Sequence, residues 1–412
     1  MPTNTDQPEI DDDIFAPEVI ADPYSYYNHL REVDPVHRNE QYKLWIVTRY
    51  DDCSWLTLHP ELFSSAIDAK DPLPPYPPIE PGEEEDAAHV KKSLQGRIIQ
   101  TDPPAHTDRR GVFKKYFSAA HMKDWRPMIT RAVNRLLDDV QSKGNGRMDV
   151  MRDFAVPLPL MVICELMEIP EEQRYEIRAI ADQMDASPLK RAQRMHILAN
   201  ALRAMDAYIE PLVEERIDQP GNDLISLAAG AERDGILTRD LVLQNLSFFV
   251  MAGHETTINL ICNGILSFIR NPDQWDLMRS DPDKYAGTAT EECLRYDPPA
   301  IGLERIAAQE INLRGKTIQP LDRVRWSACG ANRDPERFTN PESFDITRSP
   351  NTHLTFGHGI HLCLGAYLAR TEGQVIFPAL AARFGRFKLE TDQLEYLPAI
   401  NVRSLRALEV SW

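Results

Sequence analysis

The 412-residue sequence lacks a long apolar run. A helix needs about 20 consecutive apolar residues to span a bilayer, and no stretch comes near that length. Residues 1–20 are polar and acidic, and they have neither the basic n-region nor the apolar h-region of a signal peptide. We therefore expect no membrane anchor and a cytoplasmic location.

Paired cysteines and excess positive charge are absent as well. The six cysteines are scattered without a Cys-x-x-Cys pair, so the sequence predicts neither a zinc site nor a disulfide framework. Five are expected to fill the core, which leaves one for another role. Lys and Arg number 46 against 63 Asp and Glu, and the net charge of −17 argues against binding to nucleic acid or to anionic membrane surfaces.

No Gly/Ser-rich linker, low-complexity spacer or internal repeat divides the chain. We therefore expect a polar N-terminal tail over residues 1–20 and a single domain over residues 21–412, mainly α with small β-sheets. Helix-forming stretches bounded by proline or turn residues predict helices over 22–33, 51–58, 240–270, 283–296 and 364–377, the last ended or kinked by Pro378, and a series of helices over 125–218. We expect a strand over 44–48, a second sheet over 310–318 and 323–328, C-terminal strands including 398–403, and an irregular loop within 66–100.

The most informative stretch is Phe356-Gly357-His358-Gly359-Ile360-His361-Leu362-Cys363-Leu364-Gly365. Gly357 and Gly359 allow the backbone to take positive φ and to approach a flat ligand closely. Cys363 comes just before a predicted helix, whose N-terminus and backbone N–H groups favour a thiolate. Between two leucines, however, a thiolate is costly unless a positive group binds it, and a haem iron is such a group. A buried structural cysteine beside a glycine-rich turn is the alternative.

Two further patterns lie upstream. His106 and Arg110 are four residues apart, so they share a helix face and can bind a pair of carboxylates, although a solvent-exposed helix start has the same pattern. In the middle of the long helix, Ala252-Gly253-His254-Glu255-Thr256-Thr257 contains an internal glycine, which costs about 1 kcal/mol relative to alanine. A glycine at a position where helices favour other residues predicts that another group lies close to the helix backbone there. Alternatively, the Thr256 hydroxyl bonds back to a carbonyl one turn earlier and only bends the helix.

These stretches together resemble the cytochrome P-450 family. The pattern over residues 356–365 is similar to the haem-ligand loop of that family at all six defining positions. The resemblance covers nearly the whole chain from about residue 20, and it implies the cytochrome P-450 fold around haem b (iron protoporphyrin IX). Cys363 occupies the family's ligand position, so the resemblance implies that Cys363, and not His361, is the axial ligand of the iron. The implied cofactor contacts are His106, Arg110, Ala252, Gly253, Arg305, Phe356, Gly357, His361, Cys363 and Gly365.

The resemblance also implies roles on the side of the cofactor where oxygen and substrate bind. Gly253 leaves room for O2, Thr256 hydrogen-bonds the oxygen and Glu255 relays protons from solvent, so Glu255 and Thr256 are the expected catalytic residues. The 66–100 loop and the helices over 171–205 are expected to cover the substrate. The residues expected to line the pocket are Ile98, Ile99, Val250, Ala252, Ile301, Leu303 and Ile400.

A basic island between residues 106 and 126 contrasts with the acidic whole. In the family this region lies nearest the cysteine ligand, where an acidic ferredoxin-type partner docks, and complementary charge speeds such an encounter. An ordinary solvated helix face is the alternative. The expected docking site lies near Arg109, Arg110, Lys114 and Lys115.

Glu292 and Arg295 are three residues apart on one helix face and can form an ion pair. They resemble the family's buried Glu-x-x-Arg pair, whose role is structural. The family's third partner is an arginine, but the corresponding element here is Pro341-Glu342-Ser343-Phe344. Arg337 or Arg348 replaces that arginine, or backbone carbonyls do; the sequence leaves these alternatives open.

The whole pattern predicts a haem-thiolate monooxygenase that uses O2 to oxidise an apolar small molecule, with electrons from a separate ferredoxin and NAD(P)H-dependent reductase. We expect no flavin domain fused to the chain, so the redox partner is expected to be a separate protein. A peroxide-driven member of the family and a non-catalytic haem carrier or sensor are the alternatives. The substrate itself, free or presented on a carrier protein, is not specified by these residues.

Overall fold

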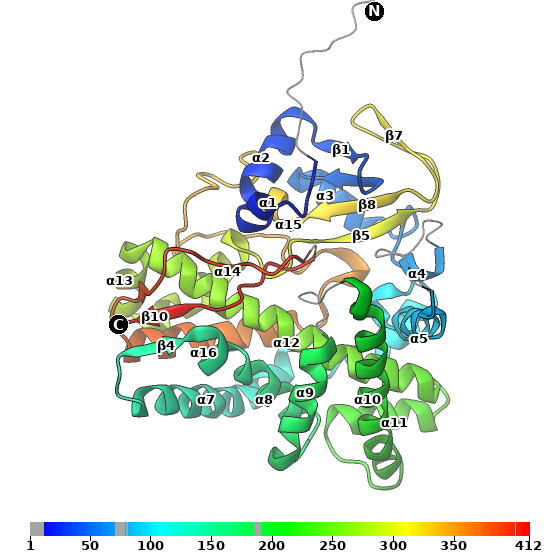
Figure 1. Cartoon of the computed structure of the whole chain (residues 1–412), viewed down its shortest axis with the longest axis horizontal. Coiled ribbons are helices and arrows are strands. Elements are labelled where there is room, and N and C mark those ends of the chain that lie inside the picture. Colours follow the sequence, from blue (N-terminus) through cyan, green and yellow to red (C-terminus); the bar gives the residue numbers. More distant parts are fainter. Residues whose placement is uncertain (1–11, 71–78, 80, 185–190, 400) are drawn as a thin grey trace, which may run out of the picture.

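The computed structural model describes residues 12–70, 79, 81–184, 191–399 and 401–412, and its fold is mainly α with small β-sheets, as the sequence predicts (Figure 1). The helices are α1 (Pro17–Ala21), α2 (Pro23–Val33), α3 (Tyr50–Leu58), α4 (Ile67–Lys70), α5 (Glu84–Gln95), α6 (Ala105–Lys114), α7 (Ala119–Ser142), α8 (Pro157–Leu166), α9 (Arg174–Met184), α10 (Arg191–Asp218), α11 (Leu224–Arg233), α12 (Arg239–Arg270), α13 (Pro272–Ser280), α14 (Pro282–Tyr296), α15 (Ala328–Ala331) and α16 (Ala366–Arg383). The shorter helical turns are η1 (Ile98–Gln100), η2 (Met151–Ala155), η3 (Glu171–Gln173) and η4 (Gly359–His361). The strands are β1 (Val36–Asn39), β2 (Leu44–Val47), β3 (Phe63–Ser64), β4 (Arg147–Asp149), β5 (Gly302–Ala307), β6 (Ile311–Leu313), β7 (Lys316–Ile318), β8 (Arg323–Ser327), β9 (Lys388–Leu389) and β10 (Glu409–Ser411).

The largest sheet has the strand order β1-β2-β8-β5-β3 and lies beside α2 and α3 at the top of Figure 1. β2 pairs in parallel with β8, and β5 pairs with the other side of β8 in antiparallel register. The prediction that residues 310–318 and 323–328 share a second sheet is therefore wrong, because β6 and β7 pair only with each other whereas β8 joins the N-terminal strands. A parallel pair between segments so distant in sequence has no local signal.

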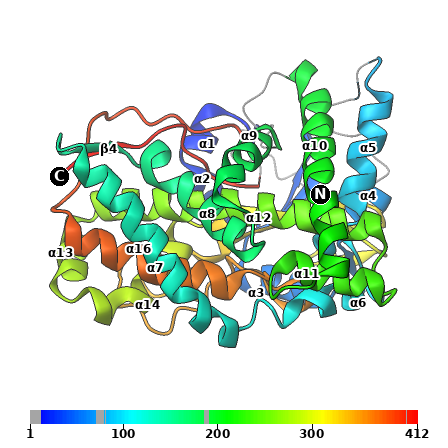
Figure 2. The same ribbon diagram turned by 90° about the horizontal axis from the view of Figure 1, so that it is seen from below.

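α12 runs through the middle of the helical part of the molecule in Figures 1 and 2, and it confirms the helix predicted over 240–270. Its first turn is capped by Thr238, whose hydroxyl accepts the N–H of Leu241 at 3.4 Å, and it ends before Pro272. From Phe249 to Phe268 its residues are buried, except for half-buried positions at 251–253 and 255–256. The middle of the helix is therefore part of the core, and most of its half-buried positions fall in the stretch singled out from the sequence.

α16 begins directly after the loop that carries Cys363 and packs between α7 and α14. Of the two outcomes predicted for Pro378, an end or a kink, the structure excludes the end, because the helix continues to Arg383. Proline has no N–H, so it leaves the carbonyl four residues earlier without its helical partner. That carbonyl belongs to Gln374, and the Arg126 guanidinium from α7 approaches it at 3.4 Å, so a neighbouring helix supplies the missing donor.

The region over 66–100 is more regular than predicted. Residues 71–78 and 80 lie outside the described part of the chain, but α4, α5 and η1 occupy most of the remainder. The acidic run beginning at Glu84 forms the first turn of α5, where the positive end of the helix dipole favours negative charge. Acidic residues at a helix start and acidic residues in a loop look alike in sequence.

Two smaller differences concern strands. β4 lies within the region that was predicted to be wholly helical and pairs with β10. The strand expected over 398–403 is only an isolated bridge between Ala300 and Val402, with Ile400 outside the described residues, and the C-terminal strands are β9 and β10. Very short strands depend on their partners more than on their own residues.

The described part of the N-terminal segment packs against the body of the protein. The Asp12 carbonyl accepts the Asn39 amide at 2.8 Å, and an Asp12 carboxylate oxygen lies 2.8 Å from His37 Nε2. Val19 packs against the cluster formed by α2 and β2. No helix in the described residues is long and apolar enough to cross a membrane.

Candidate active site

The Cys363 loop, residues 356–365, leads into α16. Gly357 and Gly359 have φ angles of 68° and 70°, which confirms the predicted positive φ. At Gly359 a Cβ atom would lie 2.6 Å from the carbonyl oxygen of Thr57 on α3, so a side chain does not fit. The Cys363 N–H donates to the Phe356 carbonyl at 2.9 Å and closes the loop on itself. Cys363 is therefore held in a fixed place just before the helix.

Cys363 differs from the other five cysteines, which are buried, in being accessible to solvent. Protein atoms nevertheless crowd the sulfur enough that burial raises the pKa of the Cys363 thiol. The backbone N–H of Gly365 and the guanidinium groups of Arg110 and Arg370 lower it, but by less. The helix start alone thus does not give a thiolate, in line with the cost that the sequence predicts for a thiolate between two leucines. A thiolate here needs a cation at the sulfur.

One imidazole of this loop, that of His361, lies next to the imidazole of His106 on α6. The ring centroids of His106 and His361 are 4.2 Å apart. Burial, followed by nearby guanidinium groups, lowers the pKa of His106 to about 4 and that of His361 to about 3, so both rings are neutral at pH 7. Among the described residues, neither ring nitrogen of His106 nor Nε2 of His361 has a hydrogen-bond partner. Buried polar groups are ordinarily bonded, so this pair has the capacity to bind a polar ligand.

Two guanidinium groups complete this set of donors. Arg110 on α6 donates to the Leu362 carbonyl at 2.5 Å, and Arg305 on β5 donates to the Glu304 carbonyl at 2.7 Å. Burial lowers the pKa of Arg305 to about 10, so it stays charged at neutral pH. Within the described residues neither guanidinium has an ion-pair partner. Two cations and two neutral imidazoles near a cysteine fit haem, because haem brings an iron for the sulfur and two propionates for the cations.

Trp326 is a candidate that the sequence analysis missed. It lies on β8, its side chain is 3% exposed, and its Nε1 has no partner among the described residues. A Cβ placed on Gly357 would lie 3.7 Å from its ring, so the indole packs directly against the Cys363 loop. In the sequence it lies in the strand Arg323–Ser327, where polar and apolar residues alternate. That pattern predicts a core residue, so nothing in the sequence indicates that Trp326 contacts the Cys363 loop.

The centre of α12 has open space on one face. Ala252, Gly253, Glu255 and Thr256 are half-buried, whereas His254 is buried. A Cβ on Gly253 would meet only Ile163 Cδ1, at 3.9 Å, so the protein's own packing does not require glycine there. The Thr256 hydroxyl donates to the Ala252 carbonyl at 2.9 Å, which is the back-bonded geometry that the sequence left open. The hydroxyl oxygen keeps its lone pairs for another donor.

The residues expected to line a substrate pocket fall into two groups. Ile99, Ala252 and Leu303 are half-buried. Val250 has no exposed surface, Ile98 is 4% exposed, and Ile301 packs with Tyr26 and Tyr27 beside α2. These last three side chains are covered by protein, and their place in the wall of the substrate pocket stays a prediction. Helix periodicity shows which positions share a face but not which neighbour covers them.

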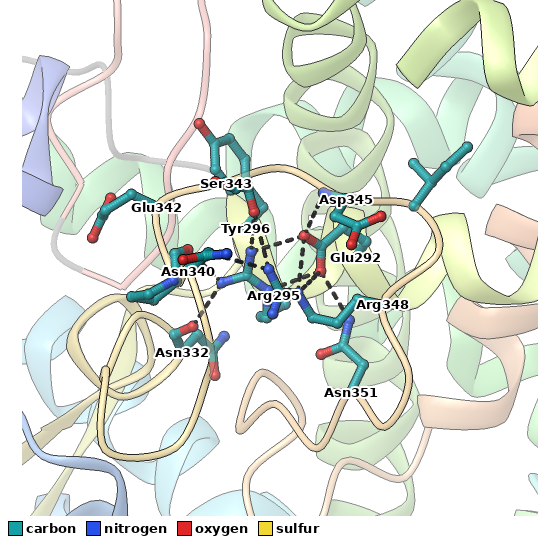
Figure 3. A network of polar contacts seen from close by, with 12 residues as sticks. Glu292, Arg295, Tyr296, Asn332, Asn340, Glu342, Ser343, Asp345, Arg348 and Asn351 are labelled. Atoms are coloured by element: carbon teal, nitrogen blue, oxygen red, sulfur yellow. Dashed lines mark hydrogen bonds and ion pairs between the residues drawn. The ribbon is translucent and has the colours of Figure 1, made fainter. Parts of the chain in front are cut away.

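The Glu292–Arg295 pair is fully buried on α14, with Nη2 2.8 Å from Oε1, and lies at the centre of the network in Figure 3. Arg348 supplies the third partner, with its Nε 3.2 Å from the Glu292 carboxylate. Arg337 is not involved and binds Thr352 instead. Of the two candidate arginines, the structure therefore selects Arg348.

Backbone carbonyls satisfy the rest of Arg295, as Figure 3 shows. Its guanidinium donates to the carbonyls of Asn332, Pro341 and Ser343 at 2.8 to 3.0 Å. Ser343 thus takes part through its main chain, which explains why its side chain need not be an arginine. A buried ion pair is tolerated when its remaining donors and acceptors are bonded in this way.

The basic island is less free than its sequence suggests. Arg109 is tied to its own chain, because it donates to the Gly96 carbonyl at 3.2 Å and to the Thr101 hydroxyl at 2.8 Å. Arg110 is turned towards the Cys363 loop. Lys114 and Lys115 remain exposed. Near the cysteine, Leu362 is 42% and Tyr367 is 50% exposed.

The arrangement as a whole suits a protein that binds a flat, doubly anionic cofactor through a cysteine. Comparison with known proteins agrees. The family model described as Cytochrome P450 matches residues 79–407. The biotin biosynthesis cytochrome P450 of Bacillus subtilis (strain 168) is 35% identical over 401 residues, which cover 96% of this chain and 97% of that protein. Cytochrome P450 monooxygenase PikC of Streptomyces venezuelae is 33% identical over 418 residues, covering 100% and 96%.

Solved structures agree with the sequence relatives. CalO2 superposes with a TM-score of 0.88 at 29% identity, covering 97% of this chain and 98% of CalO2. P450BioI, in complex with an acyl carrier protein ligated to hexadec-9Z-enoic acid, gives a TM-score of 0.83 at 32% identity, covering 96% and 99%. The chain belongs to the cytochrome P450 family. It is accordingly an enzyme of the monooxygenase type, and the cofactor of the family is haem.

Proposed function

We propose that Cys363 is the axial ligand of haem b and that the protein uses O2 to oxidise an apolar small organic molecule. The observation that carries the proposal is the convergence of a solvent-accessible Cys363 with His106, His361, Arg110 and Arg305, whose donors lack acidic partners among the described residues. The cofactor, when bound, supplies the chemistry of oxygen activation. The chain would supply a thiolate for the iron and cations for the propionates.

Thr256 and Glu255 are the proposed proton-delivery residues. The Thr256 hydroxyl is held by the Ala252 carbonyl at 2.9 Å, and both residues sit at the half-buried part of α12. A hydroxyl that donates to a carbonyl can accept a proton or a water hydrogen on its free lone pairs and pass its own proton onward. Glu255, one residue earlier and half-buried, is the group proposed to exchange protons with solvent.

The proposed substrate class is a largely apolar molecule. Half-buried Ile99, Ala252 and Leu303 support this, as do the relatives. One structural relative is described with an acyl carrier protein ligated to a fatty acid, and another relative is named a 6-deoxyerythronolide B hydroxylase. An apolar chain or macrocycle, free or carrier-bound, is therefore the class to screen first.

Electrons are proposed to arrive from a separate ferredoxin-type protein. Its docking face is formed by exposed Lys114 and Lys115, together with exposed Leu362 and Tyr367 near the cysteine. A positive and partly apolar patch in a protein of net charge −17 suits an acidic partner. Arg109 is not part of this face, because its guanidinium is bound within the chain.

The test of the proposed function is the carbon monoxide difference spectrum of the dithionite-reduced protein. We expect the strongly red-shifted Soret band of thiolate-ligated haem. Cys363→Ser should abolish that band, whereas Cys164→Ala, a substitution at a buried cysteine on α8, should keep it. A band at the position of His- or thiol-ligated haem in the unmodified protein would contradict the thiolate assignment and favour a haem carrier or sensor.

A further inference from the structure

A second polar cluster, in which His353 is buried and Glu291 and Arg370 are half-buried, lies next to the Cys363 loop and apart from the Glu292–Arg295 network. The carboxylate of Glu291 on α14 is bound by the Arg370 guanidinium of α16 in a bidentate pair, with N–O distances of 2.7 and 3.0 Å. His353 Nε2 lies 3.1 Å from the same carboxylate. Because His353 Nδ1 accepts the Thr355 N–H at 3.3 Å, Nε2 carries the proton and donates it to Glu291. One carboxylate thus orients two side chains.

Both side chains held by Glu291 flank Phe356, the first residue of the Cys363 loop. The Arg370 guanidinium carbon lies 4.5 Å from the centroid of the Phe356 ring, and the His353 ring centroid is 5.8 Å away. A guanidinium over an aromatic face at this distance is a cation–π contact. The Phe356 carbonyl in turn accepts the Cys363 N–H at 2.9 Å. A continuous series of contacts therefore runs from α14 to the cysteine.

The charges in this cluster are fixed at neutral pH. Burial opposes ionisation of Glu291, but the hydrogen bonds from His353 and Arg370 bring its pKa down to about 2. Burial lowers the pKa of His353, so that ring is neutral. The cluster thus holds one negative and one positive charge, and the positive one is Arg370, which stabilises negative charge on Cys363.

We propose that Arg370, held by Glu291, is a positioning residue for the haem-thiolate centre: it fixes the ring of Phe356 at the start of the Cys363 loop, and its charge raises the reduction potential of the iron. This inference rests on the proposed function, since it requires Cys363 as the iron ligand. Reduction adds one negative charge to the centre, so a nearby cation favours the reduced state and a nearby anion disfavours it. Arg370 and Glu291 therefore act on the potential with opposite signs.

The test is the midpoint reduction potential of the haem-loaded protein, measured by spectroelectrochemical titration. Arg370→Gln should lower the potential, and Glu291→Gln should raise it. Arg370→Lys keeps the charge but loses the planar, bidentate guanidinium. The reduction potential of this variant should therefore lie closer to that of the unmodified protein than the potential of Arg370→Gln does. Arg383→Gln is the matched control, because Arg383 is an ion-paired arginine on the same helix, bound to Asp138 and roughly 20 Å further along.

Two kinds of failure are distinguishable. If the unmodified protein lacks the red-shifted carbon monoxide band, Cys363 is not the ligand and both proposals fall. If that band is present but Arg370→Gln gives the same potential as Arg383→Gln, only the role of Arg370 is overturned. Shifts of the same sign in Arg370→Gln and Glu291→Gln would also overturn it, because general loosening of the loop does not depend on the sign of the charge removed. Haem content and thermal unfolding identify a variant that has failed to fold.

Discussion

At the scale of single residues, the hydroxyl of Thr256 can either deliver protons or merely bend α12. We expect Thr256→Ala to lower product formation by about 10²-fold or more while O2 consumption continues, because a positioned proton donor contributes about 10² to 10⁴ in rate. The unused oxygen should appear as hydrogen peroxide. The measurement is the ratio of product and peroxide to NAD(P)H consumed, with a reconstituted ferredoxin system and a substrate found by spin-state shift.

The matched control for this variant is Ser267→Ala. Ser267 lies on the same helix, and its hydroxyl donates to the Asn263 carbonyl at 2.8 Å, the same back-bonded geometry as Thr256 but within the core. Its removal should leave the ratio of product to NAD(P)H unchanged. Equal behaviour of the two variants would mean that Thr256 only shapes the helix, as expected for a carrier or sensor.

The residues around Cys363 show what a sequence can reveal. Cys363, Gly357 and Gly359 lie within ten positions of one another, so their joint pattern is local, and the positive φ angles follow from residue type. Trp326 has no such signal, because its place beside Gly357 depends on how a distant strand is paired. The hydrogen bond from Arg109 to the Gly96 carbonyl could not be predicted either, since the sequence does not indicate which partner a charged side chain binds.

At the scale of elements, the loop that follows α15 is fastened to α14 through Arg348. We expect Arg348→Gln to lower the free energy of unfolding by about 1.5–3 kcal/mol, because it removes a hydrogen-bonded cation from the buried carboxylate of Glu292. Arg337→Gln should change it by less than about 0.5 kcal/mol, since Arg337 binds the Thr352 hydroxyl at the surface. Denaturant unfolding of the haem-loaded protein measures both. Equal losses in the free energy of unfolding would show that Arg337 and Arg348 both help to hold this loop against α14.

The long helices were predictable from the sequence, but the contacts that each makes with other elements were not. The helix expected over 240–270 matches α12 within one residue. Both ends have local sequence signals, because Thr238 caps the start and Pro272 follows the end. The sequence could not decide whether α16 ends or only kinks at Pro378, since its continuation depends on Arg126 from another helix reaching Gln374. Similarly, the choice between Arg337 and Arg348 was open until the loop around Ser343 was placed against α14.

At the scale of the whole molecule, the negative net charge contrasts with the proposed docking face. We expect the double variant Lys114→Gln/Lys115→Gln to be reduced by an acidic ferredoxin about 10-fold more slowly at low salt, because electrostatic steering raises association rates by 10-fold or more. The difference should fade above about 0.5 M salt, where charges are screened. Stopped-flow reduction as a function of ionic strength measures this.

The control for the docking face is another exposed pair of adjacent lysines. Lys91→Gln/Lys92→Gln removes the same charge from α5. If steering acts through the whole-molecule charge alone, both double variants will slow equally and the docking face is placed wrongly. If only the α6 pair matters, the partner approaches the side of the molecule that carries Leu362 and Tyr367.

The parallel pairing of β2 with β8 has a consequence for how the protein is made. Val47 emerges from the ribosome about 280 residues before Trp326, its partner in the sheet. At about 5–20 residues per second, that interval is roughly 15 to 55 seconds. During it, the four apolar residues of β2, all buried in the finished protein, have no β8 to pair with and expose a strand edge. The first strands to be synthesised thus complete their pairing only after β8 has emerged, and until then their free edge can pair with other chains.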